Sequence, residues 1–252
     1  MTSNLGNKTY KIGIVMLGFD NGVRIERAIE RFYTETHLPA EIEIDFYLFA
    51  LGYPIPTPET NFIELQMIAS KRSINLCVMP NHGQYGNLIQ AHKMLASKSY
   101  DAIVCYDADT KPDRSTWLSD ALDVMAHDSK CGFVTINCSR TDNALCQQTE
   151  HLDVAGVKCA KLIWPGGWPM LMFARTFPWR LFRKTFSYYG GTEGNILDAL
   201  NKAKMHGYML REHDDLQDLE DRDAEYLAWK HYAIVRPEAM SLADWLQDQH
   251  TA

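Results

Sequence analysis

The sequence lacks a hydrophobic run long enough to cross a membrane as a helix. Its most apolar stretch, residues 162–173, is short and is interrupted by prolines and glycines, whereas a spanning helix needs about 20 apolar residues. Residues 1–11 also lack the apolar centre of a signal peptide. We therefore expect a protein without a membrane span that resides in the cytoplasm.

Paired cysteines and an excess of positive charge are missing as well. The six cysteines include no C-x-x-C pair and fit no familiar zinc-binding spacing, so we expect reduced thiols. The formal net charge is −7 at pH 7. This charge argues against non-specific coating of nucleic acid, although it is compatible with a local basic patch.

What the sequence does contain is an alternation of strand-like and helix-like segments, the pattern of βαβ units around a mainly parallel sheet. Because no linker or repeat interrupts it, we expect a single domain over residues 1–252. In the first half we expect strands at 11–17, 41–51, 74–79, 100–106 and 132–137, and helices at 23–33, 60–71, 86–97 and 113–127. In the second half we expect a loop and a helix within 139–161, a strand at 169–174, a helix at 193–206, a strand at 207–211, and helices at 221–232 and 241–249.

The most informative stretch is the fourth expected strand, which ends in Asp107-Ala108-Asp109. Two carboxylates one residue apart at a strand end can face one divalent cation. Mg²⁺ and Mn²⁺ prefer such oxygen ligands and also bind substrate phosphates. The alternative is a solvated turn, in which Pro112 breaks the chain and Asp113 caps the following helix.

Other polar residues follow neighbouring strands. Asp20 lies in the turn after the first expected strand, and Asn81 follows the third. In parallel α/β sheets, ligands bind beyond the carboxyl ends of the strands. We therefore expect Asp20, Asn81 and Asp107 at the same edge of the sheet.

The order of these pieces resembles the nucleotide-sugar glycosyltransferases of GT-A fold, particularly the family 2 type, over residues 10–215. The stretches that carry the resemblance are IVMLGFDNGVRIERAIERF at 14–32, PNHGQYGNLIQAHKMLASKSYDAIVCYDADTKPDRSTWLSDAL at 80–122, and FSYYGGTEGNILDALNKAKMHGY at 186–208. The resemblance implies an α/β, Rossmann-like, mostly parallel central sheet flanked by helices, with a smaller acceptor-side region. The donor-binding half would span about 10–140 and the acceptor-side half about 141–252.

The resemblance also implies a metal site and a donor site. Asp107 and Asp109 would hold Mn²⁺ or Mg²⁺ against the donor diphosphate, where the cation neutralises charge that develops on the leaving group. Asn81 and Gly83 would lie along the donor, or else form an ordinary helix-entry turn. A third metal ligand would be His213, with His231 as its rival.

Glu193 is implied as the general base of an inverting transfer, taking the proton of the attacking acceptor hydroxyl. The sequence departs from the family here, because it has Thr192 and Glu193 where Glu-Asp is usual. The alternative role for Glu193 is a first-turn acid that the helix dipole favours.

Recognition of the nucleotide base is a second departure. The family usually has an aspartate at the end of the second strand, where this chain has residues 49–52, FALG. Asp20 would serve instead, and uridine is the base that we expect from the family. Trp168 would stack on the sugar or the base, or else belong to the core.

The acceptor stays open between a saccharide and a modified nucleic-acid base. Residues 175–184 alternate basic and aromatic side chains, so arginines could hold phosphates while rings stack on an extruded base. The same segment also fits a half-buried helix with solvated basic residues. Two other functions compete with the transferase: a nucleotidyltransferase of related fold, and a non-catalytic nucleotide-sugar-binding module.

Overall fold

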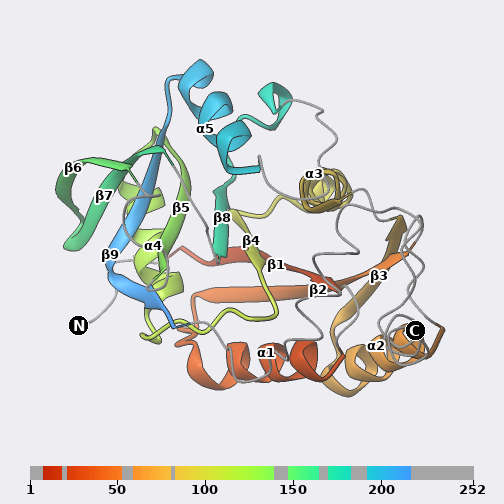
Figure 1. Ribbon diagram of the computed structural model, residues 1–252. Helices are drawn as coiled ribbons and strands as arrows, with labels where there is room; N and C mark the ends of the chain where they lie inside the picture. The colour runs from red at the N-terminus through yellow and green to blue at the C-terminus, as the bar shows by residue number, and fades with distance from the viewer. Residues whose placement is uncertain are drawn as a thin grey trace, which may run out of the picture.

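The computed structural model describes residues 8–18, 22–52, 59–80, 83–138, 147–164, 170–182 and 192–216. These residues form a nine-stranded sheet with helices on both faces (Figure 1). The strands are β1 (Tyr10–Gly18), β2 (Ile42–Gly52), β3 (Asn75–Pro80), β4 (Ala102–Tyr106), β5 (Cys131–Cys138), β6 (Gln147–Val154), β7 (Val157–Trp164), β8 (Met170–Ala174) and β9 (His206–Asp215). Their order across the sheet is β3-β2-β1-β4-β8-β5-β9-β7-β6. The expected α/β class with a mostly parallel central sheet is confirmed.

The direction of the strands sets where ligands can bind. β3, β2, β1 and β4 run parallel to one another. β8 is antiparallel to both β4 and β5, so β5 points the same way as β4, and β9 is parallel to β5. The carboxyl ends of β4, β5 and β9 therefore lie at one edge of the sheet, the edge at which ligands bind in such folds.

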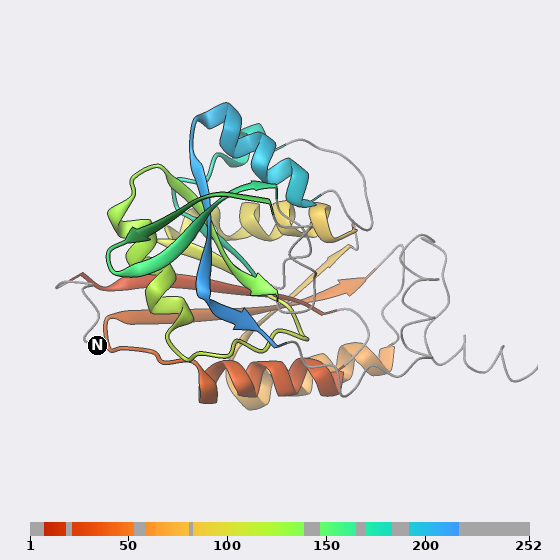
Figure 2. The same cartoon turned by 60° about the vertical axis from the view of Figure 1, so that its left-hand side comes forward.

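The helices form a layer on each face of the sheet (Figure 2). One layer holds α1 (Gly22–Glu35), α2 (Glu59–Arg72) and α4 (Trp117–His127); the other holds α3 (Gly83–Leu95), α5 (Thr192–Ala203) and the 3₁₀ turn η3 (Trp179–Leu181). In β1, Ile12 and Ile14 pack into the first layer, whereas Val15 packs into the second against α3. This strand is apolar on both sides because both of its faces are covered.

The prediction of a helix within 139–161 is wrong. Residues 147–164 instead form an antiparallel hairpin of β6 and β7. Its turn places Ala155 and Gly156 at positive φ, 57° and 85°, and the Gly156 amide donates to Asp153 Oδ1 at 2.6 Å. Leu152 and Val154 pack against the core on the α4 side, so alternating apolar residues favour a strand here.

Two boundaries near the expected metal site also differ from the sequence-based expectation. The helix expected from residue 113 begins only at Trp117, and the strand expected to end at residue 211 continues to Asp215. Both shifts have one cause, because Asp113 hydrogen-bonds to the extension of β9 instead of starting a helix. Long-range pairing thus overrides the local preference.

Some expectations fall outside these residues or stay untested. The helices expected at 221–232 and 241–249 lie outside the described residues. The division of residues 1–252 into a single domain stays a prediction. No helix in the described part of the chain is long and apolar enough to cross a membrane.

Candidate functional site

The Asp-x-Asp motif lies directly beyond the carboxyl end of β4, as the sequence predicts. The strand ends at Tyr106, whose buried ring stacks against Trp117 with ring centroids 6.1 Å apart. Asp107 and Asp109 follow, and both are half-buried. Thr110 closes the turn, because its amide donates to the Asp107 carbonyl oxygen at 3.1 Å. Both carboxylates therefore belong to a tight turn that a packed aromatic pair anchors.

The thiol of Cys105 contacts the first of these carboxylates, Asp107. Its Sγ lies 3.9 Å from Asp107 Oδ1. Burial, and then the charge of Asp107, raise the pKa of Cys105 well above its usual value. The thiol therefore stays neutral and donates its hydrogen to the Asp107 carboxylate.

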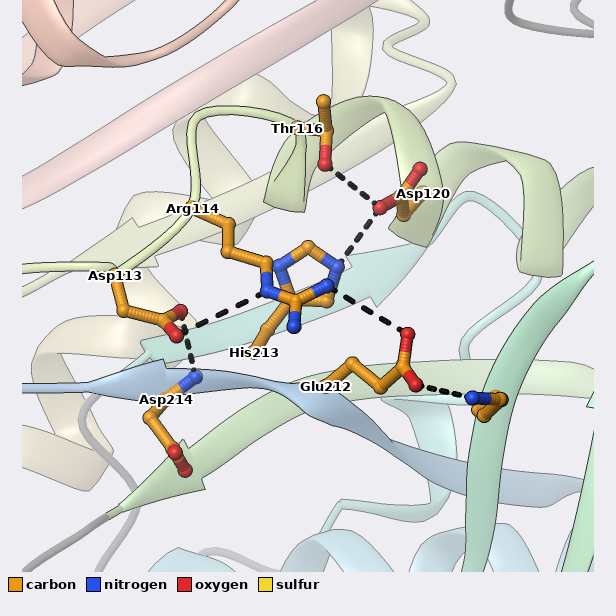
Figure 3. Close-up of polar contacts among 8 residues, drawn as sticks. Asp113, Arg114, Thr116, Asp120, Glu212, His213 and Asp214 are labelled. Carbon is orange, nitrogen blue, oxygen red and sulfur yellow. Dashed lines mark hydrogen bonds and ion pairs between the residues drawn. The ribbon is translucent and has the colours of Figure 1, made fainter. Parts of the chain in front are cut away.

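The end of β9 lies beside the residues that follow the motif, as Figures 1 and 2 both show. The Asp113 amide donates to the Asp214 carbonyl oxygen at 2.8 Å. In return, the Asp214 amide donates to Asp113 Oδ1 at 2.8 Å (Figure 3). Asn137, near the end of β5, donates through Nδ2 to Asp214 Oδ1 at 2.5 Å. The ends of β4, β5 and β9 are thus joined by side-chain and backbone hydrogen bonds.

A buried arginine on α1 also holds this turn. Arg31 on α1 is only 7% exposed, and its Nη1 donates to the Thr110 carbonyl oxygen at 2.8 Å. The Tyr106 hydroxyl donates to the same oxygen at 3.4 Å. Since a guanidinium hydrogen bond is charge-assisted, the Arg31 contact is the stronger of the two.

The histidine expected as a metal ligand, His213, lies within β9 and turns toward α4. It is 3% exposed, and its Nε2 lies 2.8 Å from Asp120 Oδ2 (Figure 3). Thr116 donates to the same oxygen at 2.9 Å. Burial raises the pKa of Asp120, but the hydrogen bonds from His213 and Thr116 outweigh it and hold the pKa below its usual value. His213 is thus firmly oriented by a carboxylate.

The two aspartates of the motif lie in one turn, and in the described residues they are not part of a larger group of possible metal ligands. Within the described part of the chain, no three His, Cys, Asp or Glu side chains are grouped so that they could hold a metal ion. Glu212, next to His213, is exposed and pairs with Lys158 and with Arg114, the latter at 3.6 Å. This neighbour of the histidine therefore belongs to a solvated surface, and the metal role of His213 stays a prediction.

The remaining predicted site residues are placed only in part. Gly83 is the first residue of α3, and Glu193 is the second residue of α5. The start of α5 is within one residue of the expected start at 193, whereas α3 begins three residues before the expected start at 86. Asp20, Asn81 and Trp168 lie outside the described residues. Their roles, and the role of the Glu193 side chain, stay predictions.

The basic and aromatic segment after β8 divides into an outer and an inner set. Arg175 and Arg180 are exposed, whereas Phe177 and Phe182 are 4% and 7% exposed. The phenylalanine rings pack edge-on with centroids 5.7 Å apart. These rings are therefore core residues, and in the described part of the segment the arginines face solvent.

Sequence reasoning missed the residues that hold the turn and the segment after it, which are Arg31, Asn137, Asp214 and Asp215, and it missed Asp120, which orients His213. A usable signal existed for Arg31, because it falls on the same helical face as Ile25, Ala28 and Phe32. Asp214 and Asp215 were hidden in the acidic run at 212–225, which reads as a solvated face.

No protein-family model matches the sequence, and no curated protein is similar to it at a significant level. Solved structures do match its fold. A mannosyltransferase from Pyrobaculum calidifontis, in complex with GDP-Man and Mn²⁺, matches with a TM-score of 0.59 and 13% identity over 89% of this chain and 61% of that one. GalNAc-T7, with UDP, GalNAc and Mn²⁺, matches with a TM-score of 0.62 and 12% identity over 83% of this chain and 44% of that one.

A nucleotidyl-type enzyme matches as well. CMP:2-keto-3-deoxy-manno-octonic acid synthetase complexed with CTP has a TM-score of 0.50 and 8% identity, over 81% of this chain and 90% of that one. The chain therefore spans less than two thirds of the two glycosyltransferases above but most of the synthetase. The expected resemblance in fold is confirmed: the described residues have the GT-A fold of nucleotide-diphospho-sugar transferases.

Proposed function

We propose that this protein is a metal-dependent glycosyltransferase that moves a sugar from a nucleoside-diphosphate sugar to an acceptor hydroxyl. The observation that carries the proposal is the Asp107–Asp109 turn. It lies at the carboxyl edge of a GT-A sheet, and hydrogen bonds from α1 and β9 hold the residues that follow it. A solvated turn would need no such support.

The residues of this turn fit a hard divalent cation, Mn²⁺ or Mg²⁺. Asp107 and Asp109 supply two carboxylates that are half-buried. Two protein ligands suffice, because such a cation keeps several waters and binds substrate phosphates. When bound, the cation neutralises the charge that develops on the departing nucleoside diphosphate. We assign His213 as a further ligand, and its orientation by Asp120 supports this assignment.

The chain's own base in this proposal is Glu193. It lies in the first turn of α5, where the helix dipole favours a charged carboxylate. Its carboxylate takes the proton of the acceptor hydroxyl while the hydroxyl oxygen bonds to the anomeric carbon. The bond from the anomeric carbon to the diphosphate oxygen breaks, and the product has inverted configuration.

The donor in this proposal is a UDP-sugar. Asp20 reads the base, Asn81 and Gly83 line the donor, and Trp168 stacks on it. In the sequence, Asp20 follows β1, which ends at Gly18, and Asn81 and Gly83 follow β3, which ends at Pro80. The acceptor is a saccharide or a modified DNA base, for which the exposed Arg175 and Arg180 supply positive charge.

A direct test is incubation with UDP-sugars and Mn²⁺, with release of UDP as the signal. Asp109→Asn should abolish release and metal-dependent donor binding. Asp101→Asn is the matched control, because Asp101 lies at the amino end of the same strand and accepts from the Lys11 amide at 3.0 Å. Full activity of Asp109→Asn in EDTA would contradict the metal role.

The synthetase-like match supports one alternative, a nucleotidyltransferase. Supplied with a nucleoside triphosphate and a sugar phosphate, such an enzyme would release pyrophosphate instead of UDP. Donor binding without release of either product would indicate a non-catalytic nucleotide-sugar-binding module.

A further inference from the structure

The last residues of β9 form a short second strand pair with the segment that follows the Asp-x-Asp turn. The Lys111 amide donates to Asp215 Oδ1 at 2.6 Å. The Leu216 amide donates to the Lys111 carbonyl oxygen at 2.9 Å, and Pro112 forms an antiparallel bridge with Asp215. These contacts join segments that lie far apart in the sequence; Lys111 and Asp215 are 104 residues apart.

Pro112 explains why these contacts matter. A proline has no amide hydrogen and a fixed φ, so the amides that can anchor the backbone here are those on either side of it. Those amides belong to Lys111 and Asp113, and both donate to β9: one to the Asp215 side chain, the other to the Asp214 carbonyl oxygen.

The Asp215 side chain, which makes one of these contacts, is completely buried. It is 0% exposed, and its Oδ1 accepts from the Lys111 amide at 2.6 Å. A buried carboxylate is costly unless it is hydrogen-bonded. Lys111 follows Asp109 by two residues in the sequence. By holding the Lys111 amide, Asp215 therefore fixes the backbone directly after the turn.

We infer that Asp215 is a positioning residue of the donor site, one that sets the geometry of Asp107 and Asp109 by holding the Lys111 amide. The inference rests on the proposed function. It gives the buried carboxylate a role that acts through the backbone, so an asparagine, whose Oδ1 also accepts a hydrogen bond, should largely replace it.

The first experiment measures the turn itself, by hydrogen–deuterium exchange of the peptide covering 107–113. Asp215→Ala should speed exchange of the Lys111 amide by at least about tenfold, since its hydrogen bond to the Asp215 side chain is lost. The matched control is Asp128→Ala. Asp128 also accepts a backbone amide, from Lys130 at 2.8 Å, but at the amino end of β5.

The second experiment measures binding of UDP with Mn²⁺ by calorimetry. Asp215→Ala should weaken binding by about tenfold or more, whereas Asp215→Asn and Asp128→Ala should stay within about threefold of wild type. Unchanged exchange or affinity in Asp215→Ala would overturn the positioning role, as would equal losses in Asp128→Ala. Loss in Asp215→Asn as large as in Asp215→Ala would show that the charge itself is required, which also overturns it. Absence of binding by the wild-type protein would instead overturn the proposed function.

Discussion

Replacing Arg31 by methionine should lower the free energy of unfolding by about 1.5–3 kcal/mol, the usual worth of a hydrogen bond to a charged group. The substitution keeps an unbranched, buried side chain but removes the donor that lies 2.8 Å from the Thr110 carbonyl oxygen. Thr110 is 0% exposed, so water cannot easily take the place of the guanidinium. The remaining contact from the Tyr106 hydroxyl, at 3.4 Å, is too long to compensate.

Urea unfolding followed by circular dichroism measures this loss, and the melting temperature should fall by roughly 3–12 °C. Arg27→Met is the control, because Arg27 is on the same helix but exposed, and a surface change of this kind alters stability by less than about 0.5 kcal/mol. If the two variants unfold together, Arg31 does not hold the turn in solution. If Arg31→Met is destabilised, its affinity for UDP with Mn²⁺ should also fall.

Three further predictions concern catalysis, charge and the acceptor. Glu193→Gln should lower kcat by about 10²–10⁴-fold with donor affinity retained, while Asp198→Asn on the same helix stays near wild type, as initial rates will show. Burial, and then the charge of Asp120, raise the pKa of Asp123 above its usual 3.8. The folded protein therefore binds a proton there more tightly than the unfolded chain, and stability falls as pH rises through that window. Asp123→Asn should accordingly raise the urea midpoint at about pH 7 and lose this advantage below about pH 3. Arg180→Ala should raise the acceptor KM more than the donor KM, and for a nucleic-acid acceptor the loss should depend on salt.

The sequence predicts the parts of this fold that depend on local pattern. The strand at 102–106 and the carboxylates after it are read from one apolar run and its abrupt end, and the structure has them at those positions. The parallel order of β1 to β4 follows from the alternation of strands and helices in the same way. In these segments, local preference and tertiary packing favour the same structure.

Where the expectations fail, long-range contacts decide. β9 extends to Asp215 because β5 and the segment around Pro112 offer it hydrogen-bonding partners. The sequence of residues 206–215 alone does not indicate these partners. The hairpin at 147–164 forms because α4 and β9 give its apolar side a surface to cover. The local pattern of apolar and polar residues at 147–164 is compatible both with this strand pair and with a loop and a helix. The sequence alone could therefore not distinguish the two.

The aspartates around the turn show the same division in chemical terms. The sequence contains two acidic groups here, one at residues 107–113 and one that begins at residue 212. Of their carboxylates, only those of Asp107 and Asp109 are predicted to bind a cation, and the second group reads as a solvated face. In the structure, Asp113, Asp214 and Asp215 each accept a hydrogen bond from the chain itself, through the Asp214 amide, Asn137 and the Lys111 amide respectively. A carboxylate that holds backbone in this way has an oxygen committed to the fold, so its removal should disturb the turn before it disturbs ligand chemistry. Asp107 and Asp109 come directly before the segment that these three residues hold. In the proposed function the cation therefore belongs to the motif pair at the end of β4, and Asp113, Asp214 and Asp215 anchor the chain that follows it.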